Sequence, residues 1–498
     1  MTSTDLVLEE RSHHRFATTA SMNRTENGDH AAGLVAVSDL DVATCSKDER
    51  LRELHAFFVQ QYEVEPKFFV KVPGRVNIIG EHVDYCGYPV LPMATRQCIL
   101  LAVAPATDDY LYLKNVNSEK YENFKCEINA FDIQIPTSGG PRWYNYFLCG
   151  VRGVQDHLGN NIPTPGMFVA VSGNIPPASG LSSSSALVSA AVLASAHIQG
   201  LPLSAQLLAT IAAQCELYIG TQGGGMDQAI AFLAKQGCAQ FIQFHPKLSA
   251  QPVKLPNNAI FVVANSLAEM NKAATSDFNE RVVECRISCR WLAKRMHLNN
   301  WRDIIRFATL QTTLQCTLED LEEIAIRELS KAFYTREDIL KEFGMNDEEF
   351  SKTILTANTQ HMQRFKLRQR TLHVLQESLR VSKFRALSES EDCKLESLSE
   401  LLMQSHESLR SLYECSHPNL DRLVEESKRF GIKARLTGAG WGGCIVSLCD
   451  SVDSCNAYIK ELKEKYYKDL PQAKGRNFDE LIFATSPQGG AEILTNKY

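Results

Sequence analysis

Four consecutive serines, Ser182 to Ser185, follow a turn of small residues and open an uncharged, apolar segment. The turn reads Pro-Pro-Ala-Ser-Gly-Leu and contains Gly180. Small residues let backbone N–H groups approach an anion, and the unpaired N–H groups of a first helical turn point the same way. Serine hydroxyls add hydrogen-bond donors for a phosphate and oxygen ligands for magnesium. The segment therefore predicts a phosphate-binding loop, with ordinary helix capping as the alternative.

This loop is not a P-loop. It lacks the Gly-Lys-Ser/Thr ending, and no such ending occurs elsewhere in the chain. A nucleotide bound here must be held by another design.

A second segment, Pro73 to Tyr85, places Arg75, Glu81, His82 and Asp84 around two glycines. Carboxylates accept hydrogen bonds from hydroxyl groups, and histidine both donates and accepts. Such a density of polar side chains in an apolar stretch is typical of a site for a polyol. A surface turn with local ion pairs is the alternative.

The third segment is Gly223-Gly224-Gly225-Met226-Asp227-Gln228. The glycines let the backbone approach a ligand, and Asp227 is a candidate catalytic base, although a lone Asp after a glycine turn also serves as a helix cap. Glu216 is the first charged residue after an uncharged stretch that spans residues 157–215. It is a candidate Mg²⁺ ligand or else a surface residue at a helix end.

A fourth segment, Arg435 to Val446, has four glycines between Gly438 and Gly443. Such a loop either shapes itself around phosphates and braces the serine loop, or forms a tight turn between two strands.

In order and character these segments resemble the signature motifs of the GHMP kinases, a family of sugar and metabolite kinases. The segment 74–85 resembles the motif of the galactokinase branch, and the resemblance covers residues 64–498. The segments 84–94, 218–228 and 264–276 are similar to those of N-acetylgalactosamine kinases. Two positions differ from ordinary galactokinases: Phe278 replaces a tyrosine that touches the sugar, and Gly225 replaces a bulkier apolar residue. A smaller residue at 225 leaves room for a 2-acetamido group, which is a hypothesis.

The resemblance implies an α+β, two-domain fold with the active site in the cleft between the domains. It implies ATP-dependent phosphorylation of the anomeric 1-OH of N-acetylgalactosamine and of galactose. Asp227 and Arg75 would be the catalytic residues. The sugar would be bound by Arg75, Glu81, His82, Asp84 and Asp227. ATP would be bound by Trp143, Gly180, Leu181, Ser182, Ser183, Ser184, Asn271 and Lys272. Mg²⁺ would be held by Ser184 and Glu216.

Three other functions stay open. The protein could be an ordinary galactokinase, or a sensor that binds sugar and ATP without turnover. Arg75, Asp227 and the four serines are all present, so the sequence shows no loss of the residues expected for catalysis. A hydrolase with a nucleophilic serine is a third alternative, but the serines lack a Gly-x-Ser-x-Gly elbow.

Composition favours a soluble, cytoplasmic enzyme with a small-molecule substrate. The net charge of −6 gives no basic surplus for nucleic acid or an anionic membrane. The fifteen cysteines show no metal-site or disulfide spacing and predict reduced thiols. Prolines interrupt the uncharged stretch 157–215, which excludes it as a membrane span. We expect a monomer.

The helices and strands that position these motifs can be predicted from the pattern of apolar and polar residues. We predict a disordered tail over residues 1–46, an N-terminal domain over 47–250 and a helix-rich C-terminal domain over 251–498. Apolar residues recur at helical spacing over 48–62 and 202–218, and a helix is also expected over 143–154. Strands are predicted at 68–72, 98–105, 110–114, 167–171, 240–244 and 259–265, with a strand-turn-strand unit over 435–449.

Overall fold

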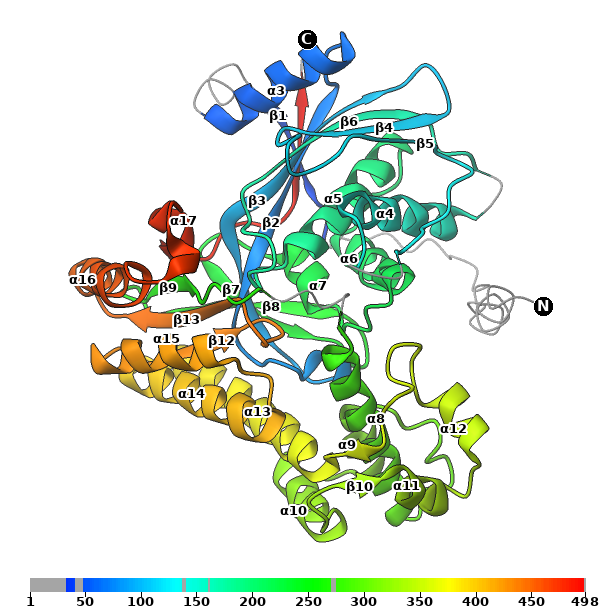
Figure 1. The fold of residues 1–498 in the computed structure, drawn as a ribbon, viewed down its shortest axis with the longest axis vertical. Helices are drawn as coiled ribbons and strands as arrows, with labels where there is room; N and C mark the ends of the chain where they lie inside the picture. Colours follow the sequence, from blue (N-terminus) through cyan, green and yellow to red (C-terminus); the bar gives the residue numbers. More distant parts are fainter. Residues whose placement is uncertain (1–32, 41–47, 137–139, 160–161, 270–274, 497–498) are drawn as a thin grey trace. The chain divides into compact units, whose positions relative to one another are not determined.

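The computed structural model describes residues 33–40, 48–136, 140–159, 162–269 and 275–496. The described residues from Val35 onward belong to one compact unit, and the account below concerns that unit. It is an α+β fold, as the sequence predicts, with two main sheets and helices packed on them (Figure 1).

The larger sheet has seven strands and carries the first two motifs. Most neighbours are antiparallel, but β1 pairs with β15 and β4 with β6 in parallel, so the sheet is mixed. In spatial order its strands are β1 (Ala36–Leu40), β15 (Glu492–Asn496), β2 (Phe68–Ile79), β3 (Leu91–Pro105), β6 (Met167–Gly173), β4 (Tyr110–Asn115) and β5 (Phe124–Glu127).

Two strands of this sheet differ from the predicted organisation. Residues 36–40 lie in the predicted disordered tail but form β1, because the last strand β15 offers them a partner. Since β15 comes from residues 492–496, the end of the chain returns to a sheet built from its first half. The division near residue 250 therefore stays a proposal about domains, and residues 1–32 lie outside the described structure.

Helices cover both faces of the larger sheet. The predicted first helix is confirmed as α3 (Glu49–Tyr62), whose N-cap Asp48 accepts from the N–H groups of Arg50 and Leu51. Its apolar residues join one face of the sheet in a small core. On the other face lie α4 (Trp143–Leu158), α5 (Ser183–Ile198), α6 (Ala205–Cys215) and α7 (Met226–Leu233).

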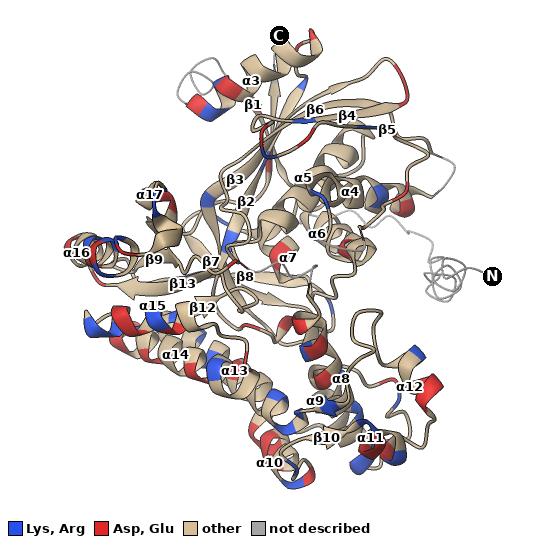
Figure 2. Ribbon diagram, viewed as in Figure 1, with Lys and Arg blue, Asp and Glu red and all other residues tan. Residues whose placement is uncertain are grey.

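Helix α5 is buried on nearly every side, which explains why its sequence carries no charge. Figure 2 shows its ribbon without charged residues, whereas charged residues colour parts of α10 and α16. The uncharged stretch 157–215 thus covers the core elements β6, α5 and α6, and none of the described helices is long and apolar enough to cross a membrane.

The second sheet brings the fourth motif to the site. Its four strands are antiparallel, in the order β12 (Ala434–Thr437), β13 (Cys444–Cys449), β9 (Ile260–Asn265) and β14 (Ile482–Thr485). The predicted strand-turn-strand unit over 435–449 is confirmed as β12 and β13. Two small ribbons are formed by β7 (Cys238–Gln243) with β8 (Ser249–Lys254) and by β10 (Tyr334–Thr335) with β11 (Arg364–Phe365).

The remaining helices belong to the second half of the chain, as its charged helical patterns predict. They are α8 (Asp277–Arg295), α9 (Phe307–Leu314), α10 (Leu318–Glu328), α11 (Arg336–Phe343), α12 (Asp347–Thr353), α13 (Leu367–Ser388), α14 (Leu395–Ser408), α15 (Pro418–Arg429), α16 (Val452–Leu462) and α17 (Phe478–Leu481). Short 3₁₀ turns cover Asp84–Cys86, Glu216–Ile219 and Pro471–Ala473, and π-helical turns cover Leu409–Tyr413 and Lys463–Tyr467.

Candidate active site

The candidate base Asp227 lies in the first turn of α7, directly after the glycine turn. Gly225 has φ of +99°, a left-handed conformation that favours glycine. Gly224 packs on the backbone of Asp84 and Tyr85, where an added Cβ would come within 2.3 Å of the Tyr85 nitrogen. These close contacts bring the second and third motifs together.

Arg75 and Asp227 form a buried ion pair between strand β2 and helix α7. The guanidinium Nε and Nη2 atoms each lie 2.8 Å from Asp227 Oδ1. Arg75 is 2% exposed and Asp227 9%. Arg75 also donates through Nη1 to the carbonyl oxygen of Gly180, so one side chain joins the sugar motif, the serine loop and the candidate base.

Arg75 lies on a strand that extends beyond the predicted end at residue 72. Strand β2 continues from Phe68 to Ile79, with a register shift between Pro73 and Arg75 that accommodates the proline. Because Val76, Ile78 and Ile79 are buried, the apolar residues of the motif belong to the core.

The serine loop has the conformation that the sequence predicts for an anion site. Ser182 has φ of +61° and precedes α5, and its Oγ atom is buried with no hydrogen-bond partner among the described residues. A buried hydroxyl without a partner is costly unless a ligand supplies one. Ser183 and Ser184 form the first turn of α5, where backbone N–H groups are unpaired.

The fourth motif braces this loop. A Cβ added at Gly438 would lie 2.6 Å from the Gly180 carbonyl oxygen, and one at Gly443 would lie 2.7 Å from the Ser179 carbonyl oxygen. Only glycine permits these backbone contacts, so the glycines of the fourth motif pack directly against the serine loop.

A cavity of about 380 Å³ extends from the serine loop to an aromatic end. Gly180, Ser182, Ser183 and Ser184 line it, as predicted for the phosphate site. Trp143 lies at its wall together with Tyr121, whose ring centroid is 5.8 Å away. Lys120, Tyr121 and Asn115 line the same cavity and were not predicted, because they occupy an ordinary polar loop and strand end.

One predicted nucleotide contact does not line this cavity, and two others cannot be placed in it. Leu181 is buried beneath the loop, where its carbonyl oxygen accepts from the Arg75 N–H at 3.2 Å. Asn271 and Lys272 lie outside the described residues.

A second, smaller cavity adjoins the first on the side of the sugar motif. His82, Asp84 and Phe278 line it, together with the glycine turn. Arg75, Glu216, Asp227 and Ala439 line both cavities, so the ion pair stands where the two meet.

Glu81 has a different environment from the one expected of a hydroxyl ligand. It lines the second cavity, but its Oε2 atom accepts from Asn77 Nδ2 at 2.8 Å and from the Arg435 guanidinium. Its Oε1 atom accepts from the Gly438 N–H at 2.8 Å. Burial raises the pKa of Glu81 to about 7, with Arg435 and the Gly438 N–H opposing that shift. The carboxylate therefore joins the second motif to the fourth.

His82 and Asp84 are also held by protein contacts. His82, with φ of +62°, uses Nδ1 toward the Tyr85 hydroxyl and Nε2 toward the Ala439 carbonyl oxygen, both at 2.9 Å. The Met226 N–H donates to Asp84 Oδ2 at 3.4 Å. Asp84 is partly exposed and remains accessible to a ligand.

The site suits Mg²⁺ only if phosphates complete its ligand set. Ser184 and Glu216 both line the first cavity, as predicted. The described residues include no cluster of three His, Cys, Asp or Glu side chains that could hold a metal alone. Magnesium in kinases takes one or two protein oxygens plus substrate phosphates, so this sparse donor set fits.

Both positions that differ from ordinary galactokinases line the smaller cavity. A Cβ added at Gly225 would lie 3.2 Å from Ala213 and 3.9 Å from Phe244, neither of which lines that cavity. The hypothesis that Gly225 makes room for an acetamido group stays a hypothesis. Phe278, 6% exposed, presents a side chain to the cavity.

Family models match three parts of the chain. They are described as galactokinase galactose-binding signature (residues 56–105), GHMP kinases N terminal domain (residues 145–235) and GHMP kinases C terminal (residues 390–468).

Two similar proteins are named galactokinase. The Dictyostelium discoideum protein is 35% identical, covering 90% of this chain and 94% of its own. The Schizosaccharomyces pombe protein is 31% identical, covering 92% of this chain and 98% of its own.

Solved structures show the same fold. Lactococcus lactis galactokinase complexed with galactose matches with a TM-score of 0.65 at 22% identity, over 89% of this chain and 99% of that one. A mevalonate kinase matches with a TM-score of 0.50 at 18% identity, over 84% of this chain and 99% of that one. The predicted fold is thereby confirmed.

Proposed function

Because this chain belongs to the galactokinase branch of the GHMP kinases, we propose that it transfers the γ-phosphoryl group of ATP to a sugar. The acceptor is the anomeric 1-OH of a galactose-configured hexose, and the products are the sugar 1-phosphate and ADP. One observation carries the proposal: the buried Arg75–Asp227 pair lies where the phosphate-side cavity meets the sugar-motif cavity.

Asp227 is the proposed general base for the sugar 1-OH. An adjacent guanidinium favours the ionised form of a carboxyl group, so Arg75 keeps Asp227 ready to accept a proton. Arg75 is also placed to stabilise negative charge on the transferring group. The buried setting excludes water from the pair.

The serine loop holds the phosphates through backbone N–H groups and the Ser182 hydroxyl, whose oxygen has no protein partner in the described structure. Ser184 and Glu216 would hold Mg²⁺, which supplies charge neutralisation to the terminal phosphates when bound. Trp143 and Tyr121 offer aromatic surface for the base at the far end of the cavity.

Galactose is the acceptor that the relatives favour, since those named here are galactokinases. N-acetylgalactosamine is the second candidate, and Phe278 is the observation that supports it. At the position where ordinary galactokinases have a tyrosine, this chain has Phe278, so the cavity is lined there by an apolar ring without a hydroxyl. An apolar wall suits the methyl group of an acetamido substituent.

Two other functions are less well supported. A sensor without turnover would not need the assembled pair of Arg75 and Asp227. A serine hydrolase needs a base beside the nucleophile, yet the described residues lining the serine cavity include no histidine. Action in the cytoplasm and as a monomer is part of the proposal, and the fourteen cysteines in the described residues are free thiols, which suits a reducing compartment.

The experiment is an ADP-release assay with ATP, Mg²⁺ and a panel of galactose, N-acetylgalactosamine, glucose and N-acetylglucosamine. We expect release with the two galactose-configured sugars and background rates with the other two. Sugar binding without ADP release would favour the sensor, and release with equal efficiency for all four sugars would contradict the proposed substrate class.

A further inference from the structure

A series of buried hydrogen bonds lies behind the wall of the smaller cavity. It begins at Cys285, which lies outside the sequence motifs, and ends at His82. The Cys285 thiol lies 3.3 Å from the Tyr413 hydroxyl, which forms a short hydrogen bond with the Tyr85 hydroxyl. Tyr85 in turn lies 2.9 Å from His82 Nδ1. The chain ends where His82 Nε2 meets the Ala439 carbonyl oxygen at 2.9 Å.

With a neutral His82 ring, the last acceptor sets the direction of every hydrogen bond in the chain. A carbonyl oxygen only accepts, so the single ring proton lies on Nε2 and Nδ1 accepts from Tyr85. A phenol has one proton, so the Tyr85 oxygen accepts from Tyr413. Tyr413 has then used its own proton and accepts from the Cys285 thiol.

A π-helical turn orients the Tyr413 side chain toward this series of hydrogen bonds. It is the last residue of the turn Leu409–Tyr413, and Glu414 follows in the left-handed conformation with φ of +55°. One residue added to a turn rotates the following side chains by about 100° about the helix axis. π turns of this kind are frequent at functional sites.

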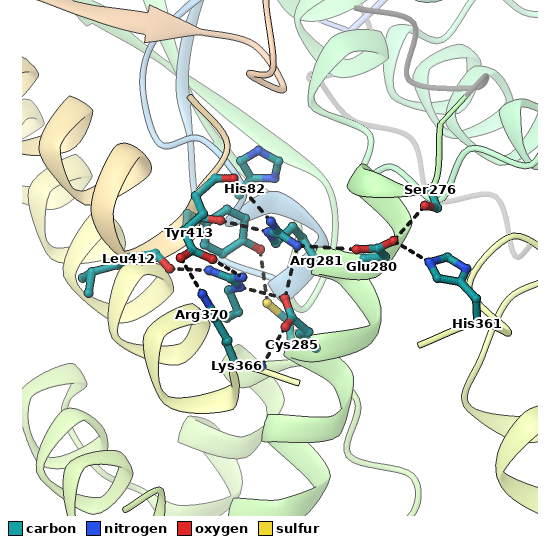
Figure 3. A network of polar contacts seen from close by, with 12 residues as sticks. His82, Ser276, Glu280, Arg281, Cys285, His361, Lys366, Arg370, Leu412 and Tyr413 are labelled. Carbon is teal, nitrogen blue, oxygen red and sulfur yellow. Dashed lines mark hydrogen bonds and ion pairs between the residues drawn. The ribbon is translucent and has the colours of Figure 1, made fainter. Parts of the chain in front are cut away.

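Two arginines hold the backbone of that turn. Arg281 Nε donates to the Tyr413 carbonyl oxygen at 2.9 Å, and Arg370 Nη1 donates to the Leu412 carbonyl oxygen (Figure 3). Glu284 fixes both arginines, with Oε2 at 2.7 Å from Arg370 Nε and 3.5 Å from Arg281 Nη1.

Figure 3 shows Tyr413 close to Cys285 and the two arginines, with His82 above them. Tyr413 and Cys285 are fully or nearly fully buried, and His82 is 4% exposed. A side chain so enclosed has no water to replace a lost partner, which makes the chain sensitive to the loss of one hydroxyl.

We propose that Tyr413 is a positioning residue for the sugar, acting through Tyr85 on His82. The Tyr413 hydroxyl orients the Tyr85 hydroxyl, and Tyr85 in turn orients the His82 ring through Nδ1. Because His82 Nε2 is hydrogen-bonded to the Ala439 carbonyl oxygen, the ring also fixes the position of Ala439 in the cavity wall. The inference rests on the proposed function, because it assumes that the cavity lined by His82 takes the sugar.

The test is Tyr413→Phe in the full chain, with galactose and N-acetylgalactosamine as probes. Loss of one buried hydrogen bond predicts a sugar KM raised about 3- to 10-fold. The KM for ATP and kcat should stay within twofold, since Arg75 and Asp227 have their own contacts.

Tyr458→Phe is the matched control. Tyr458 is also fully buried and shares a hydrogen bond with Ser427 Oγ at 2.6 Å, but it lies on α16, away from the cavity. Both variants should lower Tm, and only Tyr413→Phe should raise the sugar KM. Equal sugar KM values in the two variants would overturn the inference.

A double-mutant cycle tests whether Tyr413 acts through Tyr85. In a Tyr85→Phe background, adding Tyr413→Phe should change the sugar KM by less than twofold, whereas independent effects would multiply and contradict the inference. Should Tyr413→Phe not fold, Tyr85→Phe alone must raise the sugar KM, and an unchanged value overturns the proposal.

The sugar Kd from calorimetry separates this inference from the proposed function. A wild-type protein that binds sugar without turnover contradicts the kinase and still tests Tyr413 through Kd. A wild-type protein that turns over sugar, with Kd and KM unchanged by Tyr413→Phe, contradicts the inference alone. A wild-type protein that binds neither sugar overturns both.

Discussion

Arg75 and Asp227 lie 152 residues apart in the sequence, yet the Arg75 Nε and Nη2 atoms both lie 2.8 Å from Asp227 Oδ1 in the buried centre of the site. The same guanidinium reaches the Gly180 carbonyl oxygen. One arginine thus fixes the relative position of the candidate base, the sugar motif and the phosphate loop, and the proposed chemistry depends on it.

Asp227→Asn should lower kcat about 10²- to 10⁴-fold, the usual contribution of a general base. The neutral amide keeps the size of the side chain but cannot accept the proton of the 1-OH. ATP binding measured by calorimetry should be retained. Asp320→Asn, at the first turn of the exposed helix α10, is the matched control and should leave kcat unchanged. Equal kcat values in the two variants would exclude Asp227 as the base.

Arg75→Lys should keep the positive charge and lose the fork that reaches Asp227 and Gly180 together. Hydrogen bonds to charged groups contribute about 1.5–3 kcal/mol, so kcat should fall about 10- to 100-fold. Steady-state kinetics at saturating ATP and sugar measures this. A variant with full kcat would show that charge alone, without the geometry, is sufficient.

Glu81 and Asp84 should respond differently to removal. Glu81→Ala leaves the fully buried Arg435 without its partner and should cost about 3–5 kcal/mol of unfolding free energy. The measurement is urea unfolding at pH 8, where Glu81, with its pKa of about 7, is ionised.

Asp84→Ala should cost less than about 1 kcal/mol, because Asp84 is partly exposed and its hydrogen bond from Met226 is long. It should instead raise the sugar KM. A larger stability loss for Asp84→Ala than for Glu81→Ala would reverse these two assignments.

His373 should contribute less to stability as pH falls below 7. Burial lowers the pKa of His373 to about 3, from 6.5 in the unfolded chain. Between these values only the unfolded state binds the proton, so stability is present above pH 6.5 and is lost as pH falls. The His373 contribution lost from pH 7 to pH 5 should be about 2 kcal/mol, and the raised pKa of Glu81 offsets it by a similar amount.

His373→Gln should remove the His373 contribution. The change in unfolding free energy from pH 7 to pH 5, measured by urea unfolding, should therefore differ by about 2 kcal/mol between wild type and variant. Other titrating groups contribute equally to both proteins. The raised pKa of Glu81 stabilises the fold as pH falls in this window, in both proteins, and the pKa of Glu377 lies lower, at about 2. Equal pH dependence in wild type and variant would contradict the assignment.

Phe278→Tyr should shift the choice of sugar toward galactose. A hydroxyl placed on this wall can bond a sugar hydroxyl and crowds an acetamido methyl group. The kcat/KM ratio of N-acetylgalactosamine to galactose should fall about 10-fold, within the range of a single-group change in a pocket. A ratio within twofold of wild type would show that position 278 does not select the sugar.

The sequence predicts features that depend on local patterns. The serine turn before a helix, Asp227 after its glycines and the helix over 48–62 all follow from neighbouring residues, and the structure contains these elements. The α+β class follows from alternating strand and helix patterns, and resemblance to a family joined the motifs into one site.

Features that depend on distant partners were not predictable. The ion pair of Glu81 with Arg435 was not predicted, because Arg435 lies 354 residues away and nothing near Glu81 in the sequence indicates it. Strand β1 forms only because β15 pairs with it. Tyr413 lies outside every motif, and its link to His82 depends on a π turn that no sequence pattern announces.

The most direct test of the central claim is ³¹P NMR of the product formed from ATP and galactose or N-acetylgalactosamine. We predict a phosphate ester coupled to the anomeric proton, formed by the wild-type protein and absent with Asp227→Asn. A phosphate on any other carbon, or equal product with Asp227→Asn, would contradict anomeric phosphoryl transfer by the Arg75–Asp227 site.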